Sequence, residues 1–216
     1  FSVLFLAATM SVLYLTYFQT HRRKLITMLG WLAILFGIIL IYCMARIYLI
    51  PTQVAWNSPT VIFSFYITTL LLGIMAIACL MVLDLKFSEI KQANDVALRA
   101  QVIYYSLGGL TILGVALVTL NIAIAFFQIR LLSQGDLIAQ TSLRLLMELS
   151  LPLFVMRMIF LVYASISLTY TVIRMYKFMY APQSLMSPVY LSCLLIMVGE
   201  IIGRFLFYAT HVRVGL

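Results

Sequence analysis

Charged residues are scarce in this sequence, and their scarcity excludes whole classes of protein. Only 9% of the 216 residues are Asp, Glu, Lys or Arg, whereas 65% are hydrophobic. Soluble globular domains carry about 25% charged residues, so we expect a polytopic helical membrane protein instead. The net charge of +8 comes mainly from short loops that flank apolar segments. Such loops are typical of membrane topology, and no nucleic-acid partner follows from them.

Residues that bind metals or cofactors are also few. A haem inside a membrane usually needs two facing histidines, but His21 and His211 are the only histidines and belong on opposite faces of the membrane. Cys43, Cys79 and Cys193 each lie alone in an apolar segment without a Cys-x-x-Cys spacing. No nucleotide-binding loop or nucleophile–base arrangement is present. We therefore expect no haem, no metal and no catalytic residue in this chain.

The apolar residues gather in segments that are long enough, or nearly so, to cross about 30 Å of hydrocarbon. These segments lie near residues 1–18, 25–50, 60–83, 102–128, 149–173 and 185–211. The sequence thus predicts an all-α, polytopic transmembrane helix bundle of six helices, forming a single domain over residues 1–216. The first segment is already under way at Phe1, so we expect an N-terminal truncation rather than a signal peptide.

The basic residues of the loops predict how the chain crosses the membrane. The loops after the first, third and fifth segments carry eight of them, including Arg22, Arg23 and Lys24, whereas the opposite side has three. Lys and Arg favour the cytoplasmic side. We therefore predict an inner (cytoplasmic) membrane protein whose C-terminus lies outside the cytoplasm.

The last segment carries a polar face. At about 100° per residue, Glu200, Arg204, Tyr208 and His211 fall within about 80° of one another on a helix. A charge at the bilayer centre costs about 2.5 to 3.5 kcal/mol. Either Glu200 and Arg204 pair at i and i+4 and lock the bundle, or the face lines a pocket that handles protons or a polar headgroup. An interfacial anchoring role is an equal alternative for His211.

Other polar residues are expected at a similar depth. Arg46, followed by Tyr48, lies near the outer end of its segment and alone is typical of a snorkelling anchor. Arg157 lies deeper and is expected to turn into the bundle. Gly199 and Gly203 have the spacing that lets another helix approach closely. The outer link 130–148 is interpreted as a plain helical linker, with a docking surface as the alternative.

Residues 199–211 follow the pattern G-E-(L/I)-I-G-R-x-x-F-Y-x-x-H. This pattern closely resembles the terminal helix of the dimethyl sulfoxide reductase anchor subunit (DmsC) family. A second likeness is Met44-Ala-Arg-Ile-Tyr48, followed by a polar loop with Trp56 and an apolar helix that contains Leu-Leu-Gly at 71–73. The order and spacing agree over nearly all of the chain.

The resemblance implies an eight-helix, haem-free anchor of an anaerobic molybdoenzyme reductase. Such an anchor is not catalytic alone; it binds and oxidises menaquinol and passes electrons to an iron–sulfur subunit, which feeds a molybdenum catalytic subunit. The chain would correspond to the last six helices, and the family's quinol-site histidine and acidic residue would precede Phe1. Our quinol-pocket candidates are Glu200, Arg204, Tyr208, His211, Arg46, Tyr48 and Arg157.

The residues alone leave a second function open. Glu200, Arg204 and Arg157 could form the coupling network of a transporter or channel. The terminal electron acceptor is decided in the catalytic subunit, so this sequence does not specify it.

The loop charges make a prediction about topology. An alkaline phosphatase reporter, which is active only outside the cytoplasm, should be active after Leu216 and inactive after Arg23. A green fluorescent protein reporter should give the opposite result. The reverse pattern at both positions would contradict the predicted orientation.

Overall fold

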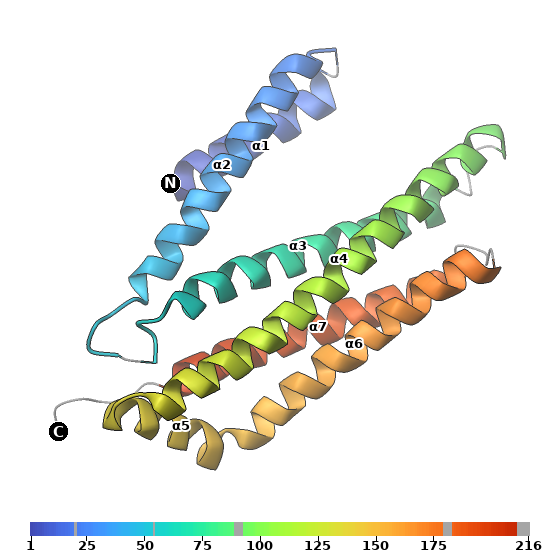
Figure 1. Cartoon of the computed structure of the whole chain (residues 1–216). Helices are drawn as coiled ribbons and strands as arrows, with labels where there is room; N and C mark the ends of the chain where they lie inside the picture. The colour runs from blue at the N-terminus through green and yellow to red at the C-terminus, as the bar shows by residue number, and fades with distance from the viewer. Residues whose placement is uncertain (20, 54, 89–92, 179–182, 211–216) are drawn as a thin grey trace. The chain divides into compact units, whose positions relative to one another are not determined.

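The computed structural model describes all residues except 20, 54, 89–92, 179–182 and 211–216. The described residues form helices joined by turns and loops, with no strand, which confirms the all-α class. Figure 1 shows how the helices follow one another. They are α1 (Ser2–Phe18), α2 (Arg23–Ile47), α3 (Pro59–Ser88), α4 (Ala93–Gln134), α5 (Leu137–Leu149), α6 (Leu151–Phe178) and α7 (Gln183–Ala209).

The chain divides into two compact units. The first holds residues 1–52 and 56–66, and the second holds residues 53–55 and 67–216. Each unit is described by itself below. The single domain expected from the sequence stays a prediction.

The first unit is built on the pairing of α1 with α2. Gly37 of α2 faces Phe5 of α1 so closely that an added Cβ would lie 3.3 Å from the Phe5 ring. The glycine therefore allows a close helix–helix approach, as small residues do in membrane proteins.

Aromatic contacts join the end of α2 to the start of α3 within the first unit. The ring of Tyr48 lies 5.5 Å from that of Phe65 and 6.0 Å from that of Trp56, measured between centroids. The Tyr66 hydroxyl donates a hydrogen bond of 2.9 Å to the carbonyl oxygen of Ile38. Such contacts hold the polar loop between α2 and α3 against the two helices.

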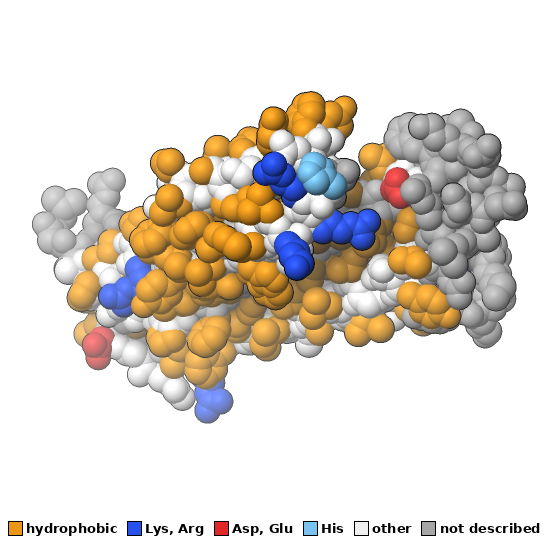
Figure 2. All heavy atoms as spheres, turned by 90° about the horizontal axis from the view of Figure 1, so that it is seen from above, with side chains coloured by type: hydrophobic (Ala, Val, Ile, Leu, Met, Phe, Trp, Pro, Cys, Tyr) orange, Lys and Arg blue, Asp and Glu red, His pale blue; other side chains and the backbone are white. Residues whose placement is uncertain are grey.

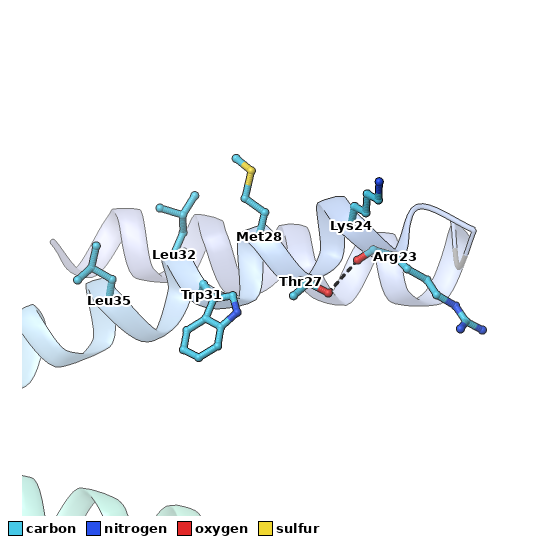
Figure 3. A pocket seen from close by; sticks show the side chains of 7 residues that line it. All are labelled: Arg23, Lys24, Thr27, Met28, Trp31, Leu32 and Leu35. Atoms are coloured by element: carbon cyan, nitrogen blue, oxygen red, sulfur yellow. Dashed lines mark hydrogen bonds between the residues drawn. The ribbon is translucent and has the colours of Figure 1, made fainter.

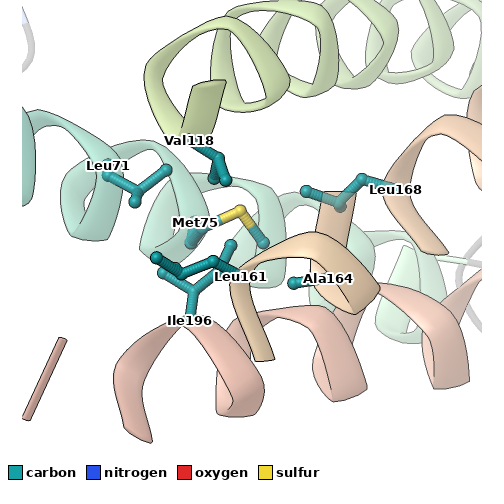
Figure 4. Close-up of a cluster of buried hydrophobic side chains, with 7 residues drawn as sticks. All are labelled: Leu71, Met75, Val118, Leu161, Ala164, Leu168 and Ile196. Carbon is teal, nitrogen blue, oxygen red and sulfur yellow. The ribbon is translucent and has the colours of Figure 1, made fainter. Parts of the chain in front are cut away.

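The core of the second unit lies among α3, α4, α6 and α7. Figure 4 shows its side chains pointing toward one another from these four helices. The fully buried members are Leu71, Met75, Val118, Leu161, Ala164, Leu168 and Ile196. Because they are almost all aliphatic, this core contributes close packing and no polar chemistry.

The described residues form seven helices, one more than the six expected from the sequence. The link at residues 130–148 contains α5, whose buried residues Ala139, Ser142 and Leu146 follow one helical stripe. Leu146 packs against Ile202 and Leu206 of α7. The link is therefore a helix, as expected, and its apolar stripe is buried against the bundle.

In the part of the chain that the structure describes, five helices are long and apolar enough to cross a membrane: α2, α3, α4, α6 and α7. α1 is apolar but has only 17 residues. Large hydrophobic side chains such as Phe205 are exposed along these helices, and Figure 2 shows hydrophobic side chains over much of one face. Water would disfavour such a surface and lipid would not, so the chain is a multi-pass membrane protein.

The packing of α3 on α7 can be tested through two cysteines. The Cys79 thiol lies within hydrogen-bonding distance of Cys193, and neither forms a disulfide. A short bifunctional thiol reagent should therefore link α3 to α7, as detected by mass spectrometry of the joined peptides. The Cys43→Ser variant should keep this link and Cys193→Ser should lose it. A product that joins Cys79 only to Cys43 would contradict the packing.

Candidate functional site

The site begins with a buried acid in α7. Glu200 is only 4% exposed, and it lies nine residues before the end of the helix at Ala209, a distance of about 14 Å along the axis. Removing a carboxylate from water is costly unless donors replace the lost hydration. The surrounding helices therefore have to supply those donors.

Three neighbouring helices supply them. The hydroxyl of Thr68 in α3 donates to Glu200 Oε2 at 2.7 Å, and the amide Nδ2 of Asn121 in α4 donates to Oε1 at 2.6 Å. An Nη atom of Arg157 in α6 lies 3.5 Å from Oε1 and donates to Asn121 Oδ1 at 3.1 Å. We call these four residues the Glu200 network. It joins four membrane-spanning helices at one point.

Arg157 lies against α7 because Gly203 has no side chain. A Cβ added at Gly203 would lie 2.7 Å from both Nε and Cζ of Arg157. One turn earlier, a Cβ at Gly199 would lie 3.4 Å from Leu161 of α6. The close helix approach expected at these two glycines is therefore confirmed, and it seats the guanidinium beside the carboxylate.

One polar atom of the network has no hydrogen-bond partner among the described residues. Arg157 Nε is buried and donates to nothing there. Leaving a buried donor unsatisfied costs about 1 to 3 kcal/mol. An acceptor supplied by a bound molecule would remove that cost.

The ion pair differs from the one expected from the sequence. One of the two alternatives from the sequence paired Arg204 with Glu200, but the structure pairs Glu200 with Arg157 of the neighbouring helix. The i, i+4 spacing places Arg204 near the acid but about 40° round the helix, where it is partly exposed and makes contacts of its own. Arg157 instead reaches Glu200 from inside the bundle, across Gly203.

The residues of the expected polar face of α7 differ in how far they are buried. Tyr208 is 50% exposed and lies on the same side of the helix as exposed Ile201 and Phe205. Glu200 lies on the buried side. His211 lies outside the described residues.

The two remaining candidates belong to the first unit. Arg46 is exposed in the last turn of α2, where a cation interacts favourably with the helix dipole. Tyr48 packs on Trp56 and Phe65. These positions fit an interface anchor, and their part in a shared pocket with Glu200 stays a prediction.

Sequence reasoning missed Thr68 and Asn121. Asn121 could have been found, because it is an amide in the middle of a 27-residue apolar segment, where a polar side chain needs a partner. Thr68 gave no such signal, since threonine hydroxyls in helices often bond to their own backbone, as Thr111 and Thr171 do here. Only the packing of α3 on α7 reveals its role.

The network offers hydrogen-bond donors and a carboxylate rather than a metal cage. In the described part of the chain, no three His, Cys, Asp or Glu side chains gather closely enough to hold a metal ion. What the arrangement can do chemically is exchange a proton at Glu200 and donate hydrogen bonds to an oxygen-bearing ligand.

Comparison with known proteins identifies a family. The family model described as DMSO reductase anchor subunit (DmsC) matches residues 1–210, which include every helix from α1 to α7. No curated protein matches the chain, and no solved structure matches it.

The network predicts how the chain responds to loss of one charge. Arg157→Leu leaves Glu200 without its cation and should lower the stability of the bundle by about 3 to 5 kcal/mol. Adding Glu200→Gln should recover much of that loss, because the stranded charge is then gone. Thermal unfolding of the detergent-purified variants measures both effects.

A matched control comes from an exposed pair. Arg144 and Glu148 lie 3.8 Å apart on α5 with side chains 79% and 70% exposed, so Arg144→Leu should cost at most about 1 kcal/mol. Equal losses for Arg157→Leu and Arg144→Leu would show that the Glu200 network does not hold the bundle together.

Proposed function

Since this chain belongs to the DMSO reductase anchor subunit (DmsC) family, we propose that it binds and oxidises menaquinol in the membrane. It then passes the electrons to an iron–sulfur subunit, which supplies a molybdenum-containing catalytic subunit. The observation that supports this most is the buried Glu200 network. The family match does not favour the transporter or channel alternative.

Quinol oxidation needs a proton acceptor at membrane depth. Menaquinol releases two electrons and two protons as it becomes menaquinone; the electrons leave to the partner subunit, and the protons must leave the quinol oxygens. Among the acidic side chains whose burial is described, Glu200 alone is buried. We assign it the role of accepting a quinol proton and releasing it toward the outer end of α7.

The other members of the network position that carboxylate. Thr68 and Asn121 hold its two oxygens from different helices, which fixes the plane of the carboxylate. Arg157 keeps one donor, Nε, without a partner in the described chain. A quinol oxygen is a suitable acceptor for it, so Arg157 would orient the ring while Glu200 takes the proton.

The remaining candidates take supporting roles in this proposal. Arg204 follows Glu200 toward the outer end of α7 and would begin the path of the released protons; Tyr208 and His211 stay candidates from the sequence. Arg46 and Tyr48 belong to the first unit and stay quinol-pocket candidates from the sequence. The chain would lie in the inner membrane, with its C-terminus outside the cytoplasm.

Gly203→Ala tests the proposal without changing any charge. The added methyl would displace the Arg157 guanidinium, since its Cβ would lie 2.7 Å from Nε. Misplacing a positioning group by about 1 Å can cost up to about a hundredfold in rate, so we expect menaquinol oxidation by the whole reductase complex to fall at least about tenfold. Electron delivery from a dye that reduces the partner subunits directly should not change.

Gly73→Ala is the matched control, because a Cβ at Gly73 meets nothing within 4 Å. It should leave both activities unchanged. If Gly203→Ala complexes assemble normally and oxidise menaquinol at the rate of Gly73→Ala complexes, the Glu200 network takes no part in quinol chemistry.

A further inference from the structure

A shallow, largely open cavity of about 660 Å³ follows one face of α2 in the first unit, and all of its lining residues belong to that helix. Arg23 and Lys24 line the end of the cavity at the start of α2. Met28, Trp31, Leu32 and Leu35 line the rest of it. Figure 3 shows Lys24, Met28, Leu32 and Leu35 projecting from one side of the helix, with Trp31 on the adjoining side. The cavity is thus cationic at one end and apolar along its length.

The apolar part is open rather than filled by the protein. Met28 is 59% exposed and Trp31 is 68% exposed. The hydroxyl of Thr27, which also lines the cavity, donates to the Arg23 carbonyl oxygen at 3.0 Å. Its polar group is therefore satisfied within α2, and the wall below the two cations is apolar.

The first unit contains basic residues but no acidic residue that could pair with them. Residues 1–52 and 56–66 contain Arg22, Arg23, Lys24 and Arg46 but no Asp or Glu. Figure 2 shows basic side chains lying near one another beside hydrophobic ones. An anionic group from outside the unit would be attracted to the exposed cations at the start of α2.

The length of the cavity indicates what that anion is attached to. Lys24 and Leu35 are eleven residues apart, or about 16 Å along the helix, which is about half of a hydrocarbon core of roughly 30 Å. α2 is long and apolar enough to cross the membrane. A water-soluble partner could reach Arg23 but could not follow the wall into the hydrocarbon.

We propose that this cavity binds one anionic phospholipid, with its phosphate on Arg23 and Lys24 and an acyl chain along Met28, Leu32 and Leu35. Trp31 lies beside the chain, about two turns below the phosphate. The site is at the end of α2 that we predict to be cytoplasmic, where anionic lipids meet basic residues. It shares no residue with the Glu200 network and does not depend on quinol chemistry.

Native mass spectrometry of the whole reductase complex tests the proposal. Phosphatidylglycerol should be retained in preference to phosphatidylcholine of the same chains. Each basic residue near a membrane surface contributes about a fivefold preference for anionic lipid, so Arg23→Gln with Lys24→Gln should weaken retention about thirtyfold. Inorganic phosphate should not displace the lipid, because it lacks the acyl chain.

Two exposed basic residues elsewhere provide the control. Arg130→Gln with Arg144→Gln removes the same charge from α4 and α5 and should leave lipid retention unchanged. An equal loss in both double variants would show that only net charge matters and would overturn the proposal. So would displacement by phosphate alone, or binding of a soluble partner at Arg23 with no preference for anionic lipid.

A second measurement does not depend on substituting the cations. The fluorescence difference between the complex and its Trp31→Phe variant isolates the emission of Trp31. Phosphatidylglycerol with brominated chains should quench this emission more strongly than brominated phosphatidylcholine at the same mole fraction. Equal quenching by the two lipids would mean that Trp31 faces bulk lipid and that no specific site exists.

Discussion

A carboxylate enclosed by helices must be given donors by those helices, and this requirement governs the second unit. Glu200 obtains them from Thr68, Asn121 and Arg157, at 2.7, 2.6 and 3.5 Å. The aliphatic core beside the network could pack in several registers, since lipid is as apolar as leucine and gives little preference among them. The four polar residues accept one register only. They therefore specify which faces of the helices meet, while the apolar residues fill the space.

The two glycines of α7 show how backbone and charge act together. Gly199 and Gly203 bring α6 close, and the Arg157 guanidinium occupies the space that a larger residue at 203 would fill. A buried ion pair needs good geometry to offset its desolvation. Here that geometry comes from a missing side chain as much as from the charged residues themselves. The same arrangement that stabilises the bundle also places a carboxylate and a spare donor at membrane depth.

The sequence predicts the helices well and the partners of the site poorly. Hydrocarbon thickness dictates the length of each apolar run, so α2, α3 and α6 begin within about three residues of the predicted positions, whereas α4 is much longer at both ends. The importance of Glu200 is also readable, because an acid in an apolar run needs a reason. The partner of Glu200 cannot be read from the sequence, because the i, i+4 rule considers residues of one helix and Arg157 belongs to another. Only the packing of α6 on α7 could decide between the two arginines.

The order of the network along the chain has a consequence for biosynthesis. Thr68, Asn121 and Arg157 leave the ribosome before Glu200, which lies in the last described helix. Until α7 is inserted, Arg157 is a cation in a membrane helix without its acid, a costly state. Arrival of α7 ends that state, because Glu200 then contacts Thr68 of α3, Asn121 of α4 and Arg157 of α6. A nascent bundle that lacks α7 therefore holds the charge of Arg157 in a membrane helix without its ion-pair partner Glu200.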